Sequence, residues 1–390
     1  MLAPARLLWK MANNKEAIIL AVWVLVLASG FAAFYFILPA YYPIQFASAE
    51  KPLVASTIVH LKTPSPLKAI YLTSWTAGSI ARRGKLIDLI DATELNAIVI
   101  DIKDYTGRVS FPIDHPVFKA IGSSEKRITD IKTLIKQLHD KNIYIIGRIS
   151  VFQDLYLVSK YPEWAVKKDS ERTVVWQDYK GLSWLDVGAP GVWDYIVLLA
   201  KESYALGFDE LNFDYIRFPS DGNMKDIYYP WSDGYEKPEV LREFFSYLHD
   251  KLKLVGAVLS ADLFGMTTTN TDDLNIGQVL EVALPYFDYI APMVYPSHYP
   301  PTFIGLGNPA AHPYEVVRYS LNAAYERSSS TPQKIRPWLQ DFNLGAVYTA
   351  EMVRKQIQAT YDAGFNSWML WDAANHYTPA ALLGEATMTN

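Results

Sequence analysis

Short runs of β-branched and aromatic residues alternate with longer amphipathic segments along most of this chain. Eight runs have the composition and length of strands: residues 69–75, 97–103, 143–150, 210–216, 255–262, 289–295, 335–341 and 367–372. Seven segments between them have the apolar spacing of helices: residues 86–95, 131–141, 192–206, 239–254, 278–286, 313–327 and 350–363. Strands that alternate with helices pair in parallel, and eight such units close a barrel. We therefore predict an α/β fold, a (β/α)8 TIM barrel.

A doubly wound open sheet is the alternative for a chain of alternating strands and helices. A sheet of that kind usually carries a glycine-rich dinucleotide fingerprint after one of its strands. No expected strand of this sequence is followed by such a fingerprint. Eight repeats also suit closure, so the barrel is the favoured architecture.

The N-terminal region has the pattern of a membrane anchor. Residues 17–38 contain no charged side chain, and Arg6, Lys10 and Lys15 precede them. A run of about 20 apolar residues is long enough to cross a bilayer, and the positive-inside rule orients it. We predict a cytoplasmic N-terminus at residues 1–16, a transmembrane signal anchor at 17–38, a Pro- and Ser-containing linker at 39–66, and a barrel at 67–390.

A cleaved signal peptide is the second interpretation of the same segment. The small residues around Ala49 have the pattern of a cleavage site, although the apolar run is longer than in most signal peptides. The expected localisation is thus a single-pass protein of the cell membrane with its barrel outside the cytoplasm. Cleavage near Ala49 would instead give a secreted protein.

Composition excludes several functional classes. The 390 residues include no cysteine, which rules out disulfides, thiolate catalysis and cysteine-ligated metal sites. With 36 Lys and Arg against 41 Asp and Glu, the chain is mildly acidic, and nucleic-acid binding is not expected. The seven histidines form no HExxH pattern, and no Walker loop or G-x-S-x-G element is present. We therefore expect no cofactor and assign no metal ligand; the sequence does not indicate an oligomeric state.

Four of the expected strand-to-helix connections are long: residues 104–130, 151–191, 217–238 and 296–312. Loops of this size in a compact domain are usually functional. In a TIM barrel all of them lie at the C-terminal face, where active sites are built. We expect long βα loops that surround a binding site for a polymer or a bulky ligand.

Acidic residues recur at the ends of the expected strands: Asp101, Asp214, Asp262, Asp341 and Asp372. A carboxylate at such a position is costly to bury unless it is paired or used. Helix capping is the structural alternative, and it is strongest for Asp341 and Asp372.

Asp214 and Asp262 are the candidate catalytic residues. Period two places Asn212 and Asp214 on one face of the fourth strand, and Asp262 ends the fifth. Neighbouring strands that end in inward carboxylates suit glycosidic bond hydrolysis. One carboxylate attacks the anomeric carbon or activates water, while the other protonates the leaving oxygen.

The remaining candidates are expected to bind substrate. Asp101 and Lys103 share a face of the second strand, where an ion pair with Arg148 or Arg217 is expected; a purely structural network is the alternative. The chain also contains 17 Phe, 26 Tyr and 11 Trp, and several fall at strand ends. Aromatic faces stack on sugar rings. The full set of expected substrate-binding residues is Asp101, Lys103, Arg148, Asn212, Arg217, Trp75, Tyr295, Trp338, Trp371 and Asp372.

Four segments resemble one bacterial family of glycoside-hydrolase-like TIM barrels, first catalogued as a domain of unknown function within the glycosidase barrel superfamily. They are residues 96–103 (NAIVIDIK), 161–164 (YPEW), 184–188 (WLDVG) and 207–219 (GFDELNFDYIRFP). The resemblance covers about residue 68 to the C-terminus and implies a barrel, export and action on polysaccharide. In similar amylase-like and melibiase-like barrels, an Asp ending strand four is the nucleophile, which Asp214 matches. Their acid lies on strand five or six; here strand five offers Asp262, and strand six ends without a carboxylate.

We therefore predict a glycoside hydrolase that acts on an extracytoplasmic polysaccharide or oligosaccharide and is held at the membrane by its N-terminal helix. A non-catalytic glycan-binding or cell-envelope scaffold protein is the alternative. A deacetylase or lyase would need a histidine metal set or a basic cleft, and the sequence shows neither.

Overall fold

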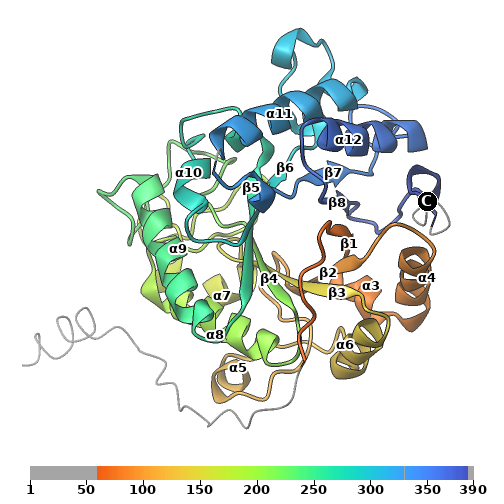
Figure 1. Cartoon of the computed structure of the whole chain (residues 1–390). Helices are drawn as coiled ribbons and strands as arrows, with labels where there is room; N and C mark the ends of the chain where they lie inside the picture. Colours follow the sequence, from red (N-terminus) through yellow and green to blue (C-terminus); the bar gives the residue numbers. More distant parts are fainter. Residues whose placement is uncertain (1–58, 329, 385–390) are drawn as a thin grey trace, which may run out of the picture. The chain divides into compact units, whose positions relative to one another are not determined.

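The computed structural model describes residues 59–328 and 330–384, and within them eight parallel strands form a closed barrel in chain order (Figure 1). Each strand pairs with its neighbours along the chain, and β8 closes on β1. The predicted (β/α)8 fold is thus confirmed. The strands are β1 Lys68–Leu72, β2 Ala97–Lys103, β3 Tyr144–Ser150, β4 Glu210–Asp214, β5 Val258–Phe264, β6 Tyr289–Met293, β7 Trp338–Gln340 and β8 Trp368–Trp371.

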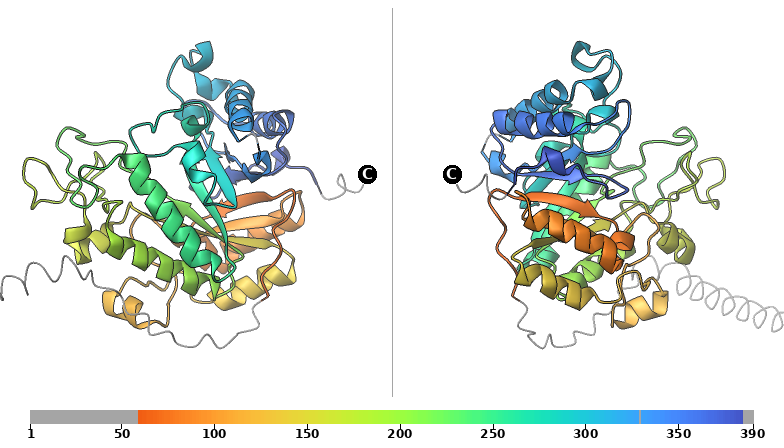
Figure 2. Two further views of the ribbon diagram at one scale, coloured as in Figure 1. Left: turned by 60° about the vertical axis from the view of Figure 1, so that its left-hand side comes forward. Right: turned by 90° about the vertical axis from the view of Figure 1, so that its right-hand side faces the viewer.

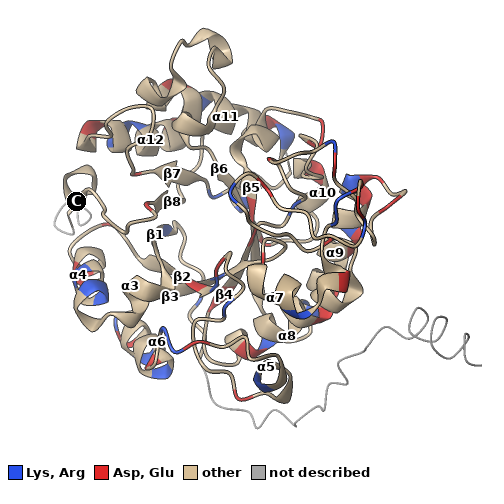
Figure 3. Cartoon of the chain, turned by 180° about the vertical axis from the view of Figure 1, so that it is seen from behind, with Lys and Arg blue, Asp and Glu red and all other residues tan. Residues whose placement is uncertain are grey.

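Helices surround the barrel on the outside (Figures 1 and 2). They are α3 Ser74–Gly78, α4 Ile80–Asp91, α5 Pro116–Ile121, α6 Ile131–Asp140, α7 Leu155–Lys160, α8 Pro190–Tyr204, α9 Lys237–Lys253, α10 Leu280–Ala283, α11 Pro313–Arg327 and α12 Ala350–Asp362. The long connections after β3 and β4 project as loops from one side of the domain in Figure 2. Acidic and basic residues are interspersed over the outer helices (Figure 3).

Every predicted strand is present, and the differences lie at the ends of elements and in three short helices outside the predicted set, α3, α5 and α7. β7 is the shortest, three residues against the seven predicted, because Pro337 directly before it has no N–H to donate to a ladder. α10 spans four residues only, and α4 begins at Ile80 rather than at residue 86. The strand-to-helix order, which determines the fold, is unaffected by these differences.

Strand register stacks alternate residues in layers inside the barrel. Arg148 pairs with Asn212, and Asn212 with Ser260, so these three residues lie at one level of β3, β4 and β5. A hydrophobic cluster packs in the same interior: Leu67, Ala69, Tyr71, Ala97, Val99, Tyr144, Ile146, Ala291, Tyr295, Trp338 and Met369. A filled interior is usual in TIM barrels, and it supports the polar residues at the C-terminal ends of the strands.

The first described residues lie at the opposite, N-terminal end of the barrel. The backbone N–H of Leu61 donates to Oδ1 of Asp209, the residue before β4, at 2.7 Å. Thr63 Oγ1 lies 3.0 Å from the hydroxyl of Tyr144, at the start of β3. Leu61 also packs against the hydrophobic cluster. The end of the predicted linker is therefore part of the folded domain.

The predicted membrane anchor lies outside the described residues. This applies to residues 1–16, to 17–38, and to the linker up to residue 58. Among residues 59–328 and 330–384, no helix has the length and apolarity needed to cross a bilayer. The anchor and the localisation that follows from it therefore stay predictions.

Candidate active site

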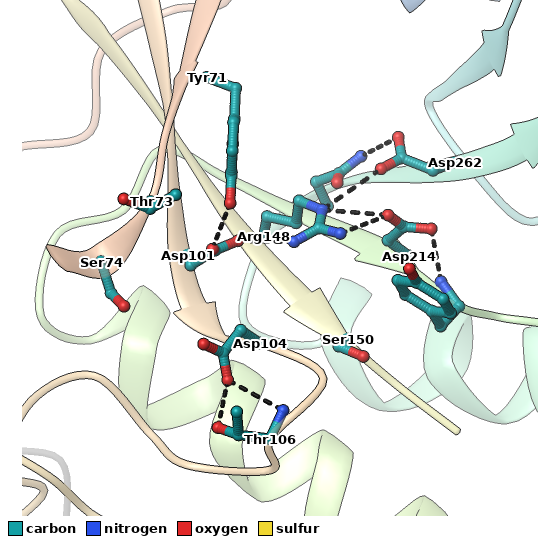
Figure 4. A network of polar contacts seen from close by, with 12 residues as sticks. Tyr71, Thr73, Ser74, Asp101, Asp104, Thr106, Arg148, Ser150, Asp214 and Asp262 are labelled. Carbon is teal, nitrogen blue, oxygen red and sulfur yellow. Dashed lines mark hydrogen bonds and ion pairs between the residues drawn. The ribbon is translucent and has the colours of Figure 1, made fainter. Parts of the chain in front are cut away.

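The guanidinium of Arg148 lies among three carboxylates at the C-terminal ends of β2, β4 and β5 (Figure 4). Its Nη1 donates to Oδ1 of Asp101 at 2.6 Å. Its Nε and Nη2 both donate to Oδ2 of Asp214, at 3.1 and 2.5 Å. Oδ2 of Asp262 lies 3.8 Å from the same Nε. The expected pairing of Asp101 with an arginine is thus present, and Arg148 is its partner.

Asp214 owes its position to an unusual backbone conformation at the next residue. Tyr215 has a φ of 49°, in the left-handed region that side chains other than glycine rarely adopt. This turn directs the backbone N–H of Tyr215 onto Oδ1 of Asp214 at 2.5 Å. The residue Asp214 is 7% exposed. Strained backbone of this kind is frequent at functional sites.

Asp262 is buried more deeply, with 1% of its surface exposed. Its Oδ1 accepts hydrogen bonds from Nδ2 of Asn212 at 2.9 Å and from Nε1 of Trp338 at 2.8 Å. Burial, and then the nearby charge of Asp214, raise the pKa of Asp262 far above its ordinary value. The opposing effects of Arg148, Asn212 and Trp338 are smaller. Asp262 is therefore suited to carry a proton at neutral pH.

The two carboxylates lie close enough for joint action on one bond. Their Oδ2 atoms are 3.1 Å and 3.8 Å from the same Nε of Arg148. These distances limit the separation of the two oxygens to less than about 7 Å, against about 5–5.5 Å in retaining and 6.5–9.5 Å in inverting glycosidases. Separations below about 7 Å include all those typical of retaining glycosidases and only the shortest ones typical of inverting glycosidases.

Tyr71 belongs to the same network, although the sequence analysis did not single it out. Its hydroxyl donates to Oδ2 of Asp101 at 2.5 Å, and its ring stacks on Trp371 at 3.9 Å. The guanidinium of Arg148 lies 5.0 Å from the Trp371 ring. Burial and the charge of Asp101 raise the pKa of Tyr71 well above its usual range, so the hydroxyl remains a donor. Period two in β1 would have placed Tyr71 on the inward face, level with Val99 of β2.

Four more predicted residues surround this network. Asn212 and Trp338 contact Asp262 directly, and Tyr295 is buried in the interior cluster beside Trp338. Trp338 also meets Trp371 edge to face at 5.4 Å. Burial, followed by the charges of Asp262 and Asp214, raises the pKa of Tyr295. These residues come from β4, the segment after β6, β7 and β8, so the site draws on both halves of the barrel.

Lys103 does not join the site, contrary to the shared face predicted for Asp101 and Lys103. The register of β2 against β3 shifts between these residues, which breaks the alternation of sides. The ammonium of Lys103 instead lies 2.6 Å from Asp154, and both side chains are fully buried. Asp154 also caps α7 by accepting from the N–H of Leu157. The pair is therefore structural.

Arg217, Trp75 and Asp372 also lie outside the Arg148 network. Arg217 is buried against the rings of Trp184 and Phe264, at 4.8 and 4.6 Å, and donates to the carbonyl of Phe218. Its expected ion pair with Asp101 is formed by Arg148 instead. Trp75 lies in α3 rather than at a strand end and is 62% exposed.

The carboxylates at the ends of β7 and β8 stabilise turns. Oδ1 of Asp372 accepts from the N–H of Ala374 at 2.6 Å. Asp341 accepts from both the backbone N–H and the hydroxyl of Thr378, at 2.9 and 2.7 Å. These bonds connect the end of β7 with the segment that follows β8. Both residues thus have structural hydrogen bonds, but neither caps a helix as the alternative expected, since α12 is capped by Thr349.

The WLDVG segment joins two loops. Asp186 accepts from the backbone N–H groups of Gly188 and Trp231, at 3.1 and 2.7 Å, and from the hydroxyl of Ser232. Gly188 follows β3 in the chain, whereas Trp231 and Ser232 follow β4. The motif therefore fixes the long loops against each other instead of supplying a reacting group. In the described part of the chain, no group of three or more His, Asp or Glu residues is arranged to hold a metal ion.

Comparison with known proteins agrees with this geometry. Residues 69–377 match the family described as "Putative glycosyl hydrolase domain". The chain belongs to this family. The match covers the barrel from β1 to the segment after β8, and with it every residue of the Arg148 network. No match was found among curated proteins.

Two solved structures with TM-scores above 0.5 share the fold of this family member. The glycoside hydrolase domain of PgaB (BpsB) from Bordetella bronchiseptica is 16% identical, with a TM-score of 0.61, over 80% of this chain and 96% of that one. Alpha-L-fucosidase isoenzyme 2 from Paenibacillus thiaminolyticus is 13% identical, with a TM-score of 0.56, over 83% of this chain and 47% of that one. A hypothetical protein from Ruminiclostridium thermocellum is 41% identical over 50% of this chain and 96% of its own length, with a TM-score of 0.45.

Proposed function

We propose that this protein is a glycoside hydrolase that cleaves an extracytoplasmic polysaccharide with Asp214 and Asp262. One observation carries the proposal: two neighbouring carboxylates at the C-terminal ends of β4 and β5 have opposite surroundings. Asp214 accepts hydrogen bonds from Arg148 and from the N–H of Tyr215. Asp262 is buried, and its pKa is raised. Paired carboxylates whose environments differ in this way divide the roles of acid and base.

The two roles follow from these surroundings. Asp262 is the general acid, which gives its proton to the leaving glycosidic oxygen. Asp214 is the nucleophile, or the base that activates water. The limit of about 7 Å between their Oδ2 atoms is compatible with either role of Asp214, and the configuration of the released sugar distinguishes the two. Arg148 positions both carboxylates, and Asp101 with Tyr71 positions Arg148.

The extracytoplasmic substrate is inferred from the predicted anchor at residues 17–38. With the N-terminus in the cytoplasm, the barrel would meet polysaccharide of the envelope or of the cell exterior. Membership of the glycosyl hydrolase domain family supports the class of reaction.

A non-catalytic glycan-binding protein is the second candidate. The observation that favours it is the burial of the carboxylates, which leaves 7% of Asp214 and 1% of Asp262 exposed. This candidate predicts glycan binding without the release of new reducing ends.

The test measures reducing ends and glycan binding with the full chain. The substrates are a panel of envelope and capsular polysaccharides and oligosaccharides prepared from them. We expect the wild-type protein to release reducing ends and Asp214→Asn to lose at least 1000-fold in rate, on the order expected for such groups. Asp341→Asn is the matched control, because Asp341 contacts Thr378 instead of Arg148. Equal turnover by Asp214→Asn and wild type would refute the assignment, and binding without cleavage by wild type would favour the second candidate.

A further inference from the structure

Three aromatic rings continue from the buried site to the surface on the β6–β7 side of the barrel. Tyr295 lies edge to face with His298 at 5.3 Å and with Phe342 at 5.5 Å, and His298 and Phe342 lie 6.0 Å apart. Tyr295 is buried, Phe342 is partly buried and His298 is exposed. We call Tyr295, His298 and Phe342 the aromatic triad.

The two loops that carry this triad are fixed by one buried side chain. Oε1 of Gln340 accepts from the N–H of Ser297 at 3.2 Å, and its Nε2 donates to the carbonyl of Phe342 at 2.9 Å. The loop after β6 and the end of β7 are thus held in one arrangement. Aromatic groups that are positioned in advance lose little entropy when a ligand binds.

His298 offers a polar atom beside the rings. Its Nδ1 lies 3.0 Å from the hydroxyl of Ser297, and the described residues give its Nε2 no hydrogen bond. Desolvation, and then the charge of Lys180, lower the pKa of His298, so the ring is neutral at neutral pH. A neutral nitrogen next to the partly exposed ring of Phe342 suits a sugar hydroxyl above an apolar ring face.

The surrounding loop also lacks charge. Between Asp288 and Glu315 the sequence contains no Asp, Glu, Lys or Arg. This segment includes β6 and the long loop after it. The segment itself therefore offers no charged side chain to a ligand, and the charge that acts on His298 comes from Lys180 in the loop after β3.

The position of Asp262 decides which part of a glycan would contact the triad. Asp262 accepts from Trp338 of β7, and Trp338 and Tyr295 belong to the same buried cluster. Asp214, by contrast, is held by Arg148 from β3. A general acid lies next to the oxygen that leaves, so the leaving-group sugar lies on the acid's side of the scissile bond. That side is the one with the triad.

We propose that the aromatic triad binds the uncharged sugar ring on the leaving-group side of the scissile bond. The ring packs on Phe342, whose position the buried Tyr295 supports, and Nε2 of His298 hydrogen-bonds to one of its hydroxyl groups. The proposal rests on the proposed function, because the side is defined by the role of Asp262.

The test compares substrates with and without a leaving-group sugar. The full-chain protein is assayed with the panel oligosaccharide that it cleaves fastest, and with the α- and β-fluorides of the donor-side sugar. Fluoride leaves without occupying a sugar subsite. We expect Phe342→Ala and His298→Ala to lower kcat/KM for the oligosaccharide by about 3- to 10-fold each, and to keep fluoride hydrolysis within about twofold of wild type.

Two further variants separate binding from folding. Val347→Ala removes an exposed apolar side chain from the same β7 loop and should leave both substrates unaffected. His298→Gln keeps a polar atom near the Nε2 position and should recover most of the loss. Equal losses on both substrates, or no loss on the oligosaccharide, would overturn the proposal.

Failure of the proposed function gives a different result. If the wild-type protein cleaves nothing, the affinity of its tightest-binding panel oligosaccharide is measured by calorimetry. Weaker binding by Phe342→Ala but not by Val347→Ala then supports a sugar site at the triad without catalysis. Unchanged binding in both variants, or no binding by wild type, overturns the triad site.

Discussion

Arg148 directs two of its nitrogens, Nε and Nη2, to a single oxygen of Asp214, at 3.1 and 2.5 Å. Its third nitrogen, Nη1, holds Asp101 at 2.6 Å. The planar guanidinium thus fixes the carboxylates of Asp101 on β2 and Asp214 on β4 relative to each other. Its positive charge lies between them. Only arginine has this fork of donors.

Arg148→Lys should therefore impair catalysis much more than folding. An ammonium keeps the charge but cannot span Asp101 and Asp214 with fixed geometry. We expect kcat to fall by about 100-fold, because small displacements of reacting groups have effects of this size. Reducing-end kinetics and thermal unfolding measure the two effects. A variant with normal kcat would show that charge alone suffices.

Trp338→Phe should move the alkaline limb of the pH profile to higher pH. Asp262 acts as an acid only while it is protonated, so kcat/KM falls as pH rises through its pKa. The indole N–H donates to Oδ1 of Asp262 and favours the ionised form. Without this donor the pKa rises further, by about one pH unit. A limb that stays in place or moves to lower pH would contradict the role of Asp262 as the acid.

Asp262→Asn should make the protein more stable at alkaline pH while it abolishes cleavage. The pKa of Asp262 is raised in the folded state, so this state holds more protons than the unfolded chain between pH 4 and the folded pKa. The contribution of Asp262 to the free energy of unfolding is fully present below about pH 4. It is lost as the pH rises from there to the pKa of Asp262 in the folded state. Asn carries no such charge, and we expect a gain of about 2 kcal/mol at pH 9.

Denaturant unfolding at pH 5 and pH 9 measures this difference. The difference in the free energy of unfolding between Asp262→Asn and wild type should be larger at pH 9 than at pH 5. An equal gap at both values would show that Asp262 does not titrate in the expected range.

Lys103→Met should destabilise the fold without changing the chemistry of the folded enzyme. It leaves the fully buried carboxylate of Asp154 without its partner, at a cost of about 3–5 kcal/mol. The double variant Lys103→Met, Asp154→Asn should regain part of that loss, because Asn keeps a cap acceptor for Leu157 and carries no charge. Unfolding midpoints and kcat per folded molecule provide the check. A large fall in kcat would instead indicate that Lys103 takes part in substrate binding.

The barrel and its strand-end carboxylates follow from the sequence because both depend on local pattern. Segments in which apolar residues recur at every second position alternate with segments in which they recur every three to four, and this predicts the order of strands and helices. The two-residue period also places the side chain of Asp214 on the inward face of its strand. Parallel pairing of neighbouring strands then brings the C-terminal ends of β4 and β5 together. These inferences need no knowledge of side-chain contacts.

The partners of these carboxylates depend on register, which the sequence does not show. Lys103 shares the predicted face of Asp101, yet a register shift in β2 sends it to Asp154. Tyr71 was overlooked because a tyrosine within an apolar strand is normally core. Its hydroxyl reaches Asp101 only because β1 and β2 pair at one particular offset.

Leu61 and Thr63 attach the incoming chain to the end of the barrel farthest from the carboxylates. A tether upstream of His60 would therefore attach to the domain at the N-terminal end of the barrel. The C-terminal ends of the strands, which carry Arg148 and its carboxylates, lie at the opposite end.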